Sequence, residues 1–217
     1  MMTGFEKAKP QSGWESRLGS ILRLREEENS NARKTRAEMR RGSSAHTEHY
    51  AYPHVYPYID SDLSEKQGKA LLRLFALTAE FNKVPQFTPS EGNRRRSFGQ
   101  WAFLVSSALA QKQNESFVPD PEDLDAVGQR LQFLHSLDAE EAILNVSRIM
   151  SLASSLPGGS PAIDYYDLFR TFLYWGNGFS PEAQNVRRRI LRDYFSAFSV
   201  NNLTPDSSQP STPSLNS

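Results

Sequence analysis

The sequence predicts an all-α protein. No stretch keeps the alternation of apolar and polar residues that is typical of a half-buried strand. Apolar residues instead recur at helical spacing, and caps and turn residues separate seven or eight such segments along the 217 residues. We find no solenoid repeat in the sequence and no glycine-rich phosphate loop after a strand.

Two helices are expected within the first sixty residues. After a segment over 1–11 that we expect to be disordered, Ser12 and Glu15 form a capping box before apolar residues at helical spacing. A second helix over 32–41 ends at Gly42 and sorts its basic residues into an arc of about 160°. A salt-bridged surface helix would intersperse its charges. The sorted charge therefore predicts contact with a polyanion such as a nucleic acid, through Arg33, Lys34, Arg36, Arg40 and Arg41.

Residues 42–59 are expected to form a loop rich in tyrosine, histidine and proline. Its histidines, His46, His49 and His54, match no common pattern of metal ligands, so we expect no metal site. Tyrosines can stack on nucleic-acid bases, but packing on the neighbouring helices is the favoured use of those in this loop. These are Tyr50, Tyr52, Tyr56 and Tyr58.

Two further capping boxes begin the next helices. Ser64 with Gln67 precedes a broad apolar face, and Ser97 with Gln100 begins a helix over 98–110 that is apolar nearly all round. We expect this second helix to be the central buried one. Three arginines stand directly before its cap, where the helix dipole repels cations, so the loop is either solvated or binds an anion. They are Arg94, Arg95 and Arg96.

Capping residues also divide the C-terminal half. Asp120, with proline at the first helical position, predicts a helix that carries Arg130. Asp138 caps the next helix, which carries Arg148. A proline- and glycine-rich break over 156–161 follows, then an apolar helix over 163–175 and a Gly-Asn-Gly loop.

The last expected helix begins at Ser180, which caps it, and contains the run VRRRILRDYF from Val186. One side of it is apolar, and Arg188 and Arg192 fall one turn apart on the opposite side. The helix is therefore expected to dock by one face and offer guanidinium groups on the other. From residue 200 the composition is typical of a disordered tail.

Charge and composition exclude several functional classes. The 25 basic and 25 acidic residues cancel, yet they are segregated, with eight acids against one arginine over 115–141. The chain has no cysteine, which excludes disulfides, thiolate catalysis and cysteine-bound zinc. We find no constellation of catalytic groups, signal peptide or membrane-length apolar run. We expect a cytoplasmic protein that is no enzyme and needs no cofactor.

The chain resembles the small subunit of type I-E CRISPR surveillance complexes, called Cascade. The similarity is strongest over 130–195 and includes the Ile163-Asp164-Tyr165 motif. The run from Val186 is similar to the family motif V-x-R-R-W-A-R-D-F-Y, with Ile190 in place of the tryptophan and the final aromatic pair inverted. Two shorter motifs precede it in the right order, RAEMRR over 36–41 and SFG over 97–99.

The resemblance implies two small helical bundles in tandem, which we expect over 12–113 and 114–199, between the ends over 1–11 and 200–217 whose composition predicts disorder. It implies a non-catalytic subunit that contacts guide RNA, target DNA, other Cascade subunits and a second copy of itself, without a membrane. Such a subunit stabilises the guide–target duplex and the displaced strand of an R-loop. Besides the basic residues named above, its nucleic-acid contacts include Arg148, Arg188 and Arg192.

Two other functions remain open. A helix-turn-helix regulator would use 186–195 as its recognition helix, although its exposed arginines are not accompanied by the amide and hydroxyl side chains that read bases. A helical scaffold would use its arginines only for salt bridges with the acidic stretch over 115–141. That pairing is expected for Arg130, Arg170 and Arg187, which we leave out of the predicted binding set.

Overall fold

The computed structural model describes residues 13–89, 95–176 and 179–202. In these ranges the chain forms nine α-helices and four short 3₁₀ helices, and the only β-type pairing there is a single parallel bridge between Gln86 and Ile163. The predicted all-α fold is confirmed. Several expectations fall outside the described residues: the disordered segment over 1–11, most of the disordered tail over 200–217, the cap at Ser12, Arg94, and positions 177–178 of the Gly-Asn-Gly loop. The tail begins later than expected, because residues 200–202 continue the last helix, which ends at Asn202.

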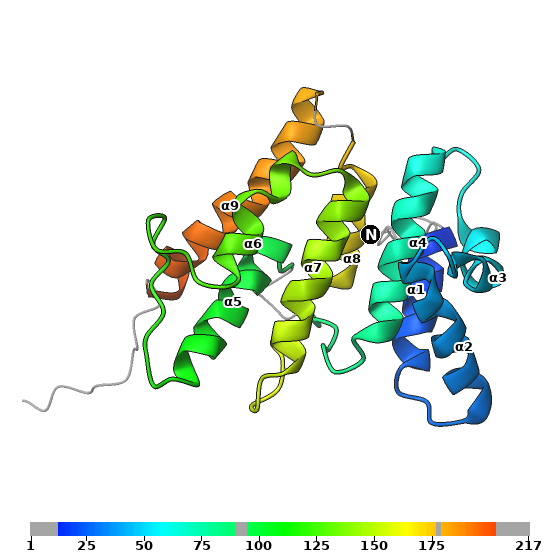
Figure 1. Cartoon of the computed structure of the whole chain (residues 1–217), viewed down its shortest axis with the longest axis horizontal. Helices are drawn as coiled ribbons and strands as arrows, with labels where there is room; N and C mark the ends of the chain where they lie inside the picture. The colour runs from blue at the N-terminus through cyan, green and yellow to red at the C-terminus, as the bar shows by residue number, and fades with distance from the viewer. Residues whose placement is uncertain (1–12, 90–94, 177–178, 203–217) are drawn as a thin grey trace, which may run out of the picture.

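Four helices form the N-terminal end of the molecule (Figure 1). They are α1 (Gly13–Leu24), α2 (Ser30–Arg40), α3 (Tyr52–Val55) and α4 (Glu65–Glu80). The capping box of α4 is present as predicted, because Ser64 accepts from the Gln67 backbone and the Gln67 side chain accepts from Ser64. Local sequence thus sets where this helix begins.

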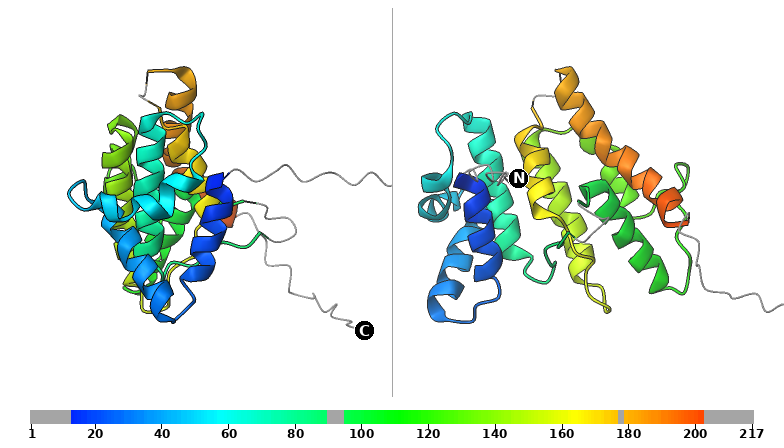
Figure 2. Two further views of the ribbon diagram at one scale, coloured as in Figure 1. Left: turned by 90° about the vertical axis from the view of Figure 1, so that its right-hand side faces the viewer. Right: turned by 180° about the vertical axis from the view of Figure 1, so that it is seen from behind.

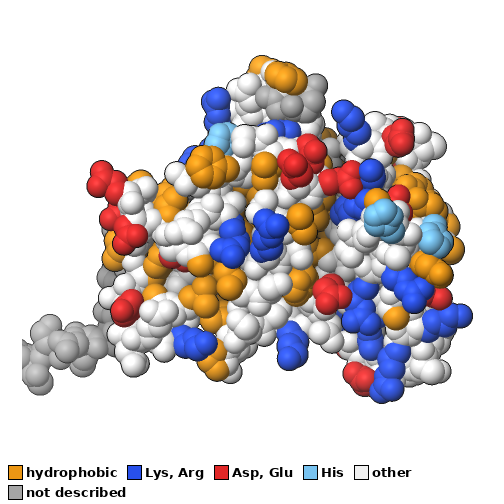
Figure 3. All heavy atoms as spheres, in the orientation of Figure 1, with side chains coloured by type: hydrophobic (Ala, Val, Ile, Leu, Met, Phe, Trp, Pro, Cys, Tyr) orange, Lys and Arg blue, Asp and Glu red, His pale blue; other side chains and the backbone are white. Residues whose placement is uncertain are grey.

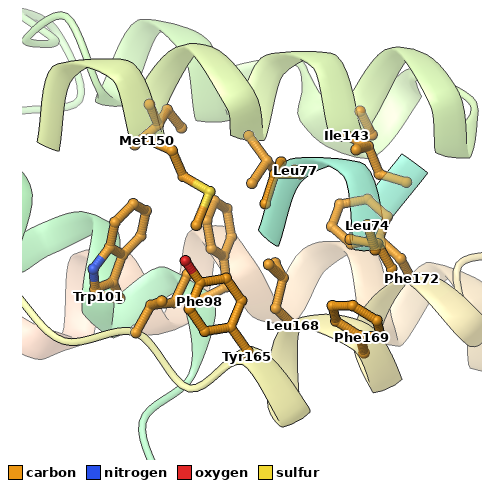
Figure 4. Close-up of a cluster of buried hydrophobic side chains, with 14 of the residues drawn as sticks. Leu74, Leu77, Phe98, Trp101, Ile143, Met150, Tyr165, Leu168, Phe169 and Phe172 are labelled. Atoms are coloured by element: carbon orange, nitrogen blue, oxygen red, sulfur yellow. The ribbon is translucent and has the colours of Figure 1, made fainter. Parts of the chain in front are cut away.

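Five helices form the rest of the fold. They are α5 (Phe98–Gln111), α6 (Gly128–Gln132), α7 (Ala139–Ser154), α8 (Tyr165–Leu173) and α9 (Pro181–Asn202). Helix α5 lies along α9, and α4 packs against α1 and α2 on one side and α7 and α8 on the other (Figures 1 and 2). The core lies between α4, α5, α7 and α8 and combines side chains from all four helices, among them Leu74, Trp101, Met150 and Phe169 (Figure 4).

The expectation of a central buried helix over 98–110 is confirmed for the first part of that helix only. Helix α4 is buried from Ala70 to Ala79, whereas α5 is buried only from Phe98 to Ser106, and its last turn is partly exposed. The end of α5 carries small side chains, among them Ser107, Ala108 and Ala110, and these are only partly buried. The division into bundles at 113 and 114 stays a prediction, although α5, which precedes that boundary, packs on α9, which follows it.

Residues 42–59 are not the open loop that composition predicted. They form two 3₁₀ turns (Arg41–Ser43 and Glu48–Tyr50), α3, and a third 3₁₀ turn over Tyr56–Tyr58. Each of the last two helical turns has a proline in its first positions, where the missing N–H costs no hydrogen bond and φ is already helical. Composition detected the prolines but not the helical turns that they begin.

The helix predicted to begin at Asp120 was also wrong. The carboxylate of Asp120 accepts from the backbone N–H of Glu122, 2.8 Å away, which closes a tight turn instead of capping a helix. Helix α6 begins only at Gly128, whose N–H donates to Asp125 at 2.8 Å. Asp120 thus fits a local rule for helix capping without capping a helix.

Candidate nucleic-acid interface

Helix α2 carries the first group of predicted binding residues on its exposed face. Asn29 caps the helix by accepting from the Ala32 N–H at 2.8 Å, and buried Ala32 and Met39 attach it to the core. Lys and Arg side chains gather over this end of the molecule (Figure 3). The burial of one face therefore leaves the sorted charges in solvent.

Three of these basic side chains form surface ion pairs. Arg33 lies 3.0 Å from Glu28, Lys34 lies 3.9 Å from Glu38, and Arg40 lies 3.7 Å from Glu80, with the basic side chains 64%, 74% and 48% exposed. Exposed pairs of this kind contribute about 0–1 kcal/mol each, so a phosphate can replace the carboxylate at little cost. These pairs leave the α2 bases available for binding.

Arg36 has a different environment from its neighbours on α2. Its guanidinium donates to the carbonyl oxygens of Leu24 at 2.7 Å and Glu27 at 2.6 Å, with a longer bond to that of Arg25. Those carbonyls belong to the end of α1 and the turn after it, where no N–H of the helix can reach them. Arg36 thus caps the C-terminal end of α1 and is half-buried. A helical wheel of α2 cannot show this, because the carbonyls that it binds belong to another segment.

Arg41 is exposed and has no carboxylate partner among the described side chains. Its guanidinium lies over the ring of Tyr50, 4.2 Å from the centroid. A guanidinium that lies on an aromatic ring keeps its charge, and the side turned away from the ring stays accessible to other groups. It remains able to bind an anion.

The arginines before α5 divide in a similar way. Arg95 is exposed, whereas Arg96 donates to the carbonyl of Ala162 at 2.7 Å and lies 4.4 Å from the centroid of the Phe87 ring. Burial lowers the pKa of the Arg96 guanidinium. Arg96 therefore anchors the segment before α5 to the segment that precedes α8.

Arg148 of α7 and Arg188 of α9 are both exposed and hydrogen-bond to neutral amide oxygens. Arg148 donates to Asn145 at 3.2 Å, and Arg188 donates to Gln184 at the same distance. Their charges are thus uncompensated by any described carboxylate within hydrogen-bonding distance. Arg192 is 72% exposed and pairs with its neighbour Asp193 at 3.2 Å.

Arg187, next to Arg188, is buried and lies outside the predicted binding set. It donates to the carbonyls of Trp175, His135, Leu137 and Gly176 at 2.9–3.1 Å, and its guanidinium lies over the Trp175 ring. These acceptors are main-chain oxygens, and no ion pair with a described acid of 115–141 forms, although the charge of Asp138 in that stretch raises the pKa of Arg187 against the lowering by burial.

The same correction applies to the other two arginines for which salt bridges were expected. Arg170 pairs at 2.5 Å with Glu15 of α1, which lies far from the acidic stretch in sequence. Arg130 donates to the carbonyl of Ala126, one turn before it. The acidic stretch instead contributes Glu140, which contacts Arg73 and Lys69 of α4.

Sequence reasoning missed a hollow of about 220 Å³ between α8, α9 and the start of α5. Arg95, Arg170 and Arg189 line it together with Asp167 and Asp193. Arg189 lies 3.3 Å from Asp167 and 3.1 Å from Asp193, so the acids offset most of the positive charge. Only the i, i+4 pairing of Arg189 with Asp193 was detectable in the sequence.

The predicted basic residues lie on two separate surfaces. Helices α2, α3 and α7 lie on one side of the molecule and α1, α8 and α9 on the other (Figures 1 and 2). We call the first group the α2 surface (Arg33, Lys34, Arg40 and Arg41) and the second the α9 surface (Arg188 and Arg192).

The described part of the chain contains no group of three or more His, Asp or Glu side chains that could hold a metal ion. None of its helices is long and apolar enough to cross a membrane.

Comparison with known proteins identifies the family. The family model described as CRISPR-associated protein Cse2 matches residues 35–195, well over half of the chain. No curated protein matches the sequence.

Solved structures share the fold. A Cse2-family protein from Thermus thermophilus is 21% identical, with a TM-score of 0.58 over 86% of this chain and 99% of its own. A chain of a CRISPR RNA-guided surveillance complex is 19% identical, with a TM-score of 0.58 over 88% of this chain and 95% of its own. CasB of M. ruber is 19% identical, with a TM-score of 0.57 over 86% of this chain and 96% of its own. The chain therefore belongs to the CRISPR-associated protein Cse2 family, as its resemblance to the small subunit of type I-E surveillance complexes predicted.

Proposed function

We propose that this chain is a non-catalytic, nucleic-acid-binding subunit of a cytoplasmic, RNA-guided antiviral complex. In this role it stabilises the guide–target heteroduplex and the displaced DNA strand by contacts to their backbones. The observation that carries the proposal is the state of Arg41, Arg148 and Arg188. All three are exposed, and none has a carboxylate partner among the described side chains.

Such contacts are sufficient because R-loop formation is energetically almost balanced. The RNA–DNA duplex that forms is about as stable as the DNA duplex that it replaces, so a few backbone contacts shift the equilibrium. Charge without base specificity is all that this requires. The exposed ion pairs of Arg33, Lys34 and Arg40 add further cations that can exchange a carboxylate for a phosphate.

The separation of the α2 and α9 surfaces supports contact with more than one strand. One continuous strand would have to pass around the molecule to reach both, because the two helices lie on opposite sides (Figure 2). A target strand and a displaced strand can instead each use one surface. The net charge of zero favours a protein that binds weakly alone and acts when held beside other Cascade subunits, guide RNA and a second copy.

The test compares two charge-matched triple variants inside the assembled complex. One carries Arg41→Gln, Arg148→Gln and Arg188→Gln, and the control carries Lys66→Gln, Lys83→Gln and Lys112→Gln. The control lysines are exposed as well, so both variants lose the same charge. Dissociation of target DNA from the R-loop is measured across a salt series, with thermal unfolding of each isolated subunit as the check on folding.

We expect the arginine variant to release target DNA faster and the lysine control to match the wild type. The slope of log affinity against log salt should fall by about 0.7 for each single-strand phosphate that the variant no longer neutralises. Equal behaviour of both variants would contradict the proposal and favour a structural scaffold. Sequence-selective binding of a duplex by the isolated chain would favour a helix-turn-helix regulator.

A further inference from the structure

The segment over 48–58 exposes four tyrosine rings next to the α2 surface. Between residues 13 and 89, every large apolar side chain that is substantially exposed is one of these four. Their exposed fractions range from 37% to 44%. They are Tyr50, Tyr52, Tyr56 and Tyr58.

Ala51 and Val55 are fully buried and attach the segment to the core, whereas the tyrosines on either side of them keep more than a third of their surface exposed. Pro53 and Pro57 fix the backbone of the two turns that carry the rings. Part of the expected packing on the helices is present, because the Tyr56 ring lies 3.9 Å from the place of a Cβ at Gly68 of α4 and the Tyr58 ring lies under Arg17 of α1.

Two of the rings are covered by arginine rather than by apolar side chains. Arg41 lies 4.2 Å from the Tyr50 centroid, and Arg17 lies 4.6 Å from that of Tyr58. The His49 ring lies 4.3 Å from Tyr50 on centroids. Guanidinium, imidazole and phenol planes are the side chains on which unpaired bases stack.

The acids of this region are engaged within the protein. Glu38 lies 2.7 Å from His54, and Glu48 lies 2.6 Å from buried Arg73 and accepts from the Tyr52 hydroxyl at 2.8 Å. The outward surface is therefore aromatic and basic, and it continues into the α2 surface through Arg41. Tyrosine and arginine are also enriched in protein interfaces, so the experiment below includes an assembly test that separates the two kinds of partner.

We propose that segment 48–58 with Arg41 is a stacking platform for the unpaired bases of a single strand whose phosphates contact the α2 surface. The platform rests on the proposed function, because it requires the chain to bind nucleic acid. It adds a contribution to affinity that depends on bases but not on their sequence, since every base has a π face. The short helical turns of the segment present the rings, and the basic side chains of the α2 surface supply the charge.

The experiment compares two strands and three variants of the full-length chain. The probes are labelled oligo(dT) of about 20 nucleotides, which exceeds the span of a single-strand-binding fold, and an abasic phosphodiester of equal length. Anisotropy at low salt measures both affinities. Tyr50→Leu with Tyr56→Leu removes two rings and keeps apolar volume, Tyr50→Phe with Tyr56→Phe keeps the rings, and Tyr174→Leu removes an exposed ring on another part of the molecule.

We expect wild type to bind oligo(dT) more tightly than the abasic strand, and the double leucine variant to lose about 10- to 100-fold for oligo(dT) alone. Its salt slope should be unchanged, and the phenylalanine and Tyr174 variants should bind as wild type. Equal affinity of wild type for both strands would overturn the platform but leave the proposed function intact. Failure of the isolated chain to bind either strand would also overturn the platform, whereas the proposed function is tested separately inside the assembled complex.

Co-purification with the other Cascade subunits and guide RNA tests whether the rings instead contact another protein subunit. If the double leucine variant keeps the preference for oligo(dT) but no longer assembles, the rings belong to a protein interface and the platform is wrong. Thermal unfolding of each variant shows whether a loss of affinity follows from a loss of folding.

Discussion

Gly99 of α5 lies directly against the carbonyl oxygen of Ile190 in α9. A Cβ atom at this position would meet that oxygen, and also the backbone nitrogen of Tyr194, more closely than real Cβ atoms approach backbone. The absence of a side chain thus lets the two helices lie together along their length.

Gly99→Ala should therefore lower the free energy of unfolding, by about 1–3 kcal/mol, because α5 and α9 must separate to admit the methyl group. Chemical denaturation of wild type and variant measures the change. Gly158→Ala is the control, since nothing lies within 4 Å of a Cβ there. An unchanged stability of Gly99→Ala would mean that the two helices are further apart than described.

Arg187→Met should destabilise the protein by about 3–5 kcal/mol, because four main-chain carbonyls lose a charged donor at a buried position. Arg188→Met, one residue away and exposed, should change stability by less than about 0.5 kcal/mol. Urea denaturation compares the two. Similar losses in both would contradict the assigned burial of Arg187.

Arg33→Gln and Arg36→Gln should affect different properties, although both remove one charge from α2. Arg36→Gln should cost about 1–2 kcal/mol of stability, because the carbonyls at the end of α1 lose their donor. Arg33→Gln should leave stability unchanged and speed release of target DNA from the complex. If Arg36→Gln impaired only DNA retention, its role as a closing residue of α1 would be wrong.

The stability of the protein should depend on pH through Asp167. Burial raises the pKa of its carboxyl above the ordinary value of 3.8, while the nearby Arg189 offsets part of this rise. Between 3.8 and the raised pKa the folded protein binds more protons than the unfolded chain, so this contribution to stability declines as pH rises through that window. Above the window the charged, buried carboxylate remains a cost.

Asp167→Asn should remove this contribution. The difference in unfolding free energy between variant and wild type should shift in favour of the variant as pH rises above 3.8 and then become constant. Urea denaturation at a series of pH values measures it. A difference that is constant across the whole range would show that Asp167 titrates normally.

Much of the fold could be predicted because its signals are local. The caps at Ser64, Ser97 and Asp138 lie where the side-chain hydrogen bonds form in the structure. A cap needs only a backbone N–H two or three residues away, so sequence contains all of its geometry. Asp120 shows the limit of such local prediction. It fits the rule for a helix cap, but its carboxylate closes a tight turn instead.

The sequence by itself determined the all-α class, the long helices, the family and the sorting of charge on α2 and α9. Only the tertiary structure decided which arginines are free to bind: Arg36, Arg96 and Arg187 donate to carbonyls supplied by distant segments, whereas Arg41, Arg148 and Arg188 do not. It also decided that the tyrosines of 48–58 face outward, because Ala51 and Val55 fill the core beneath them. A helical pattern specifies which face a residue occupies, but the atoms opposite that face come from elsewhere in the chain and meet it only on folding.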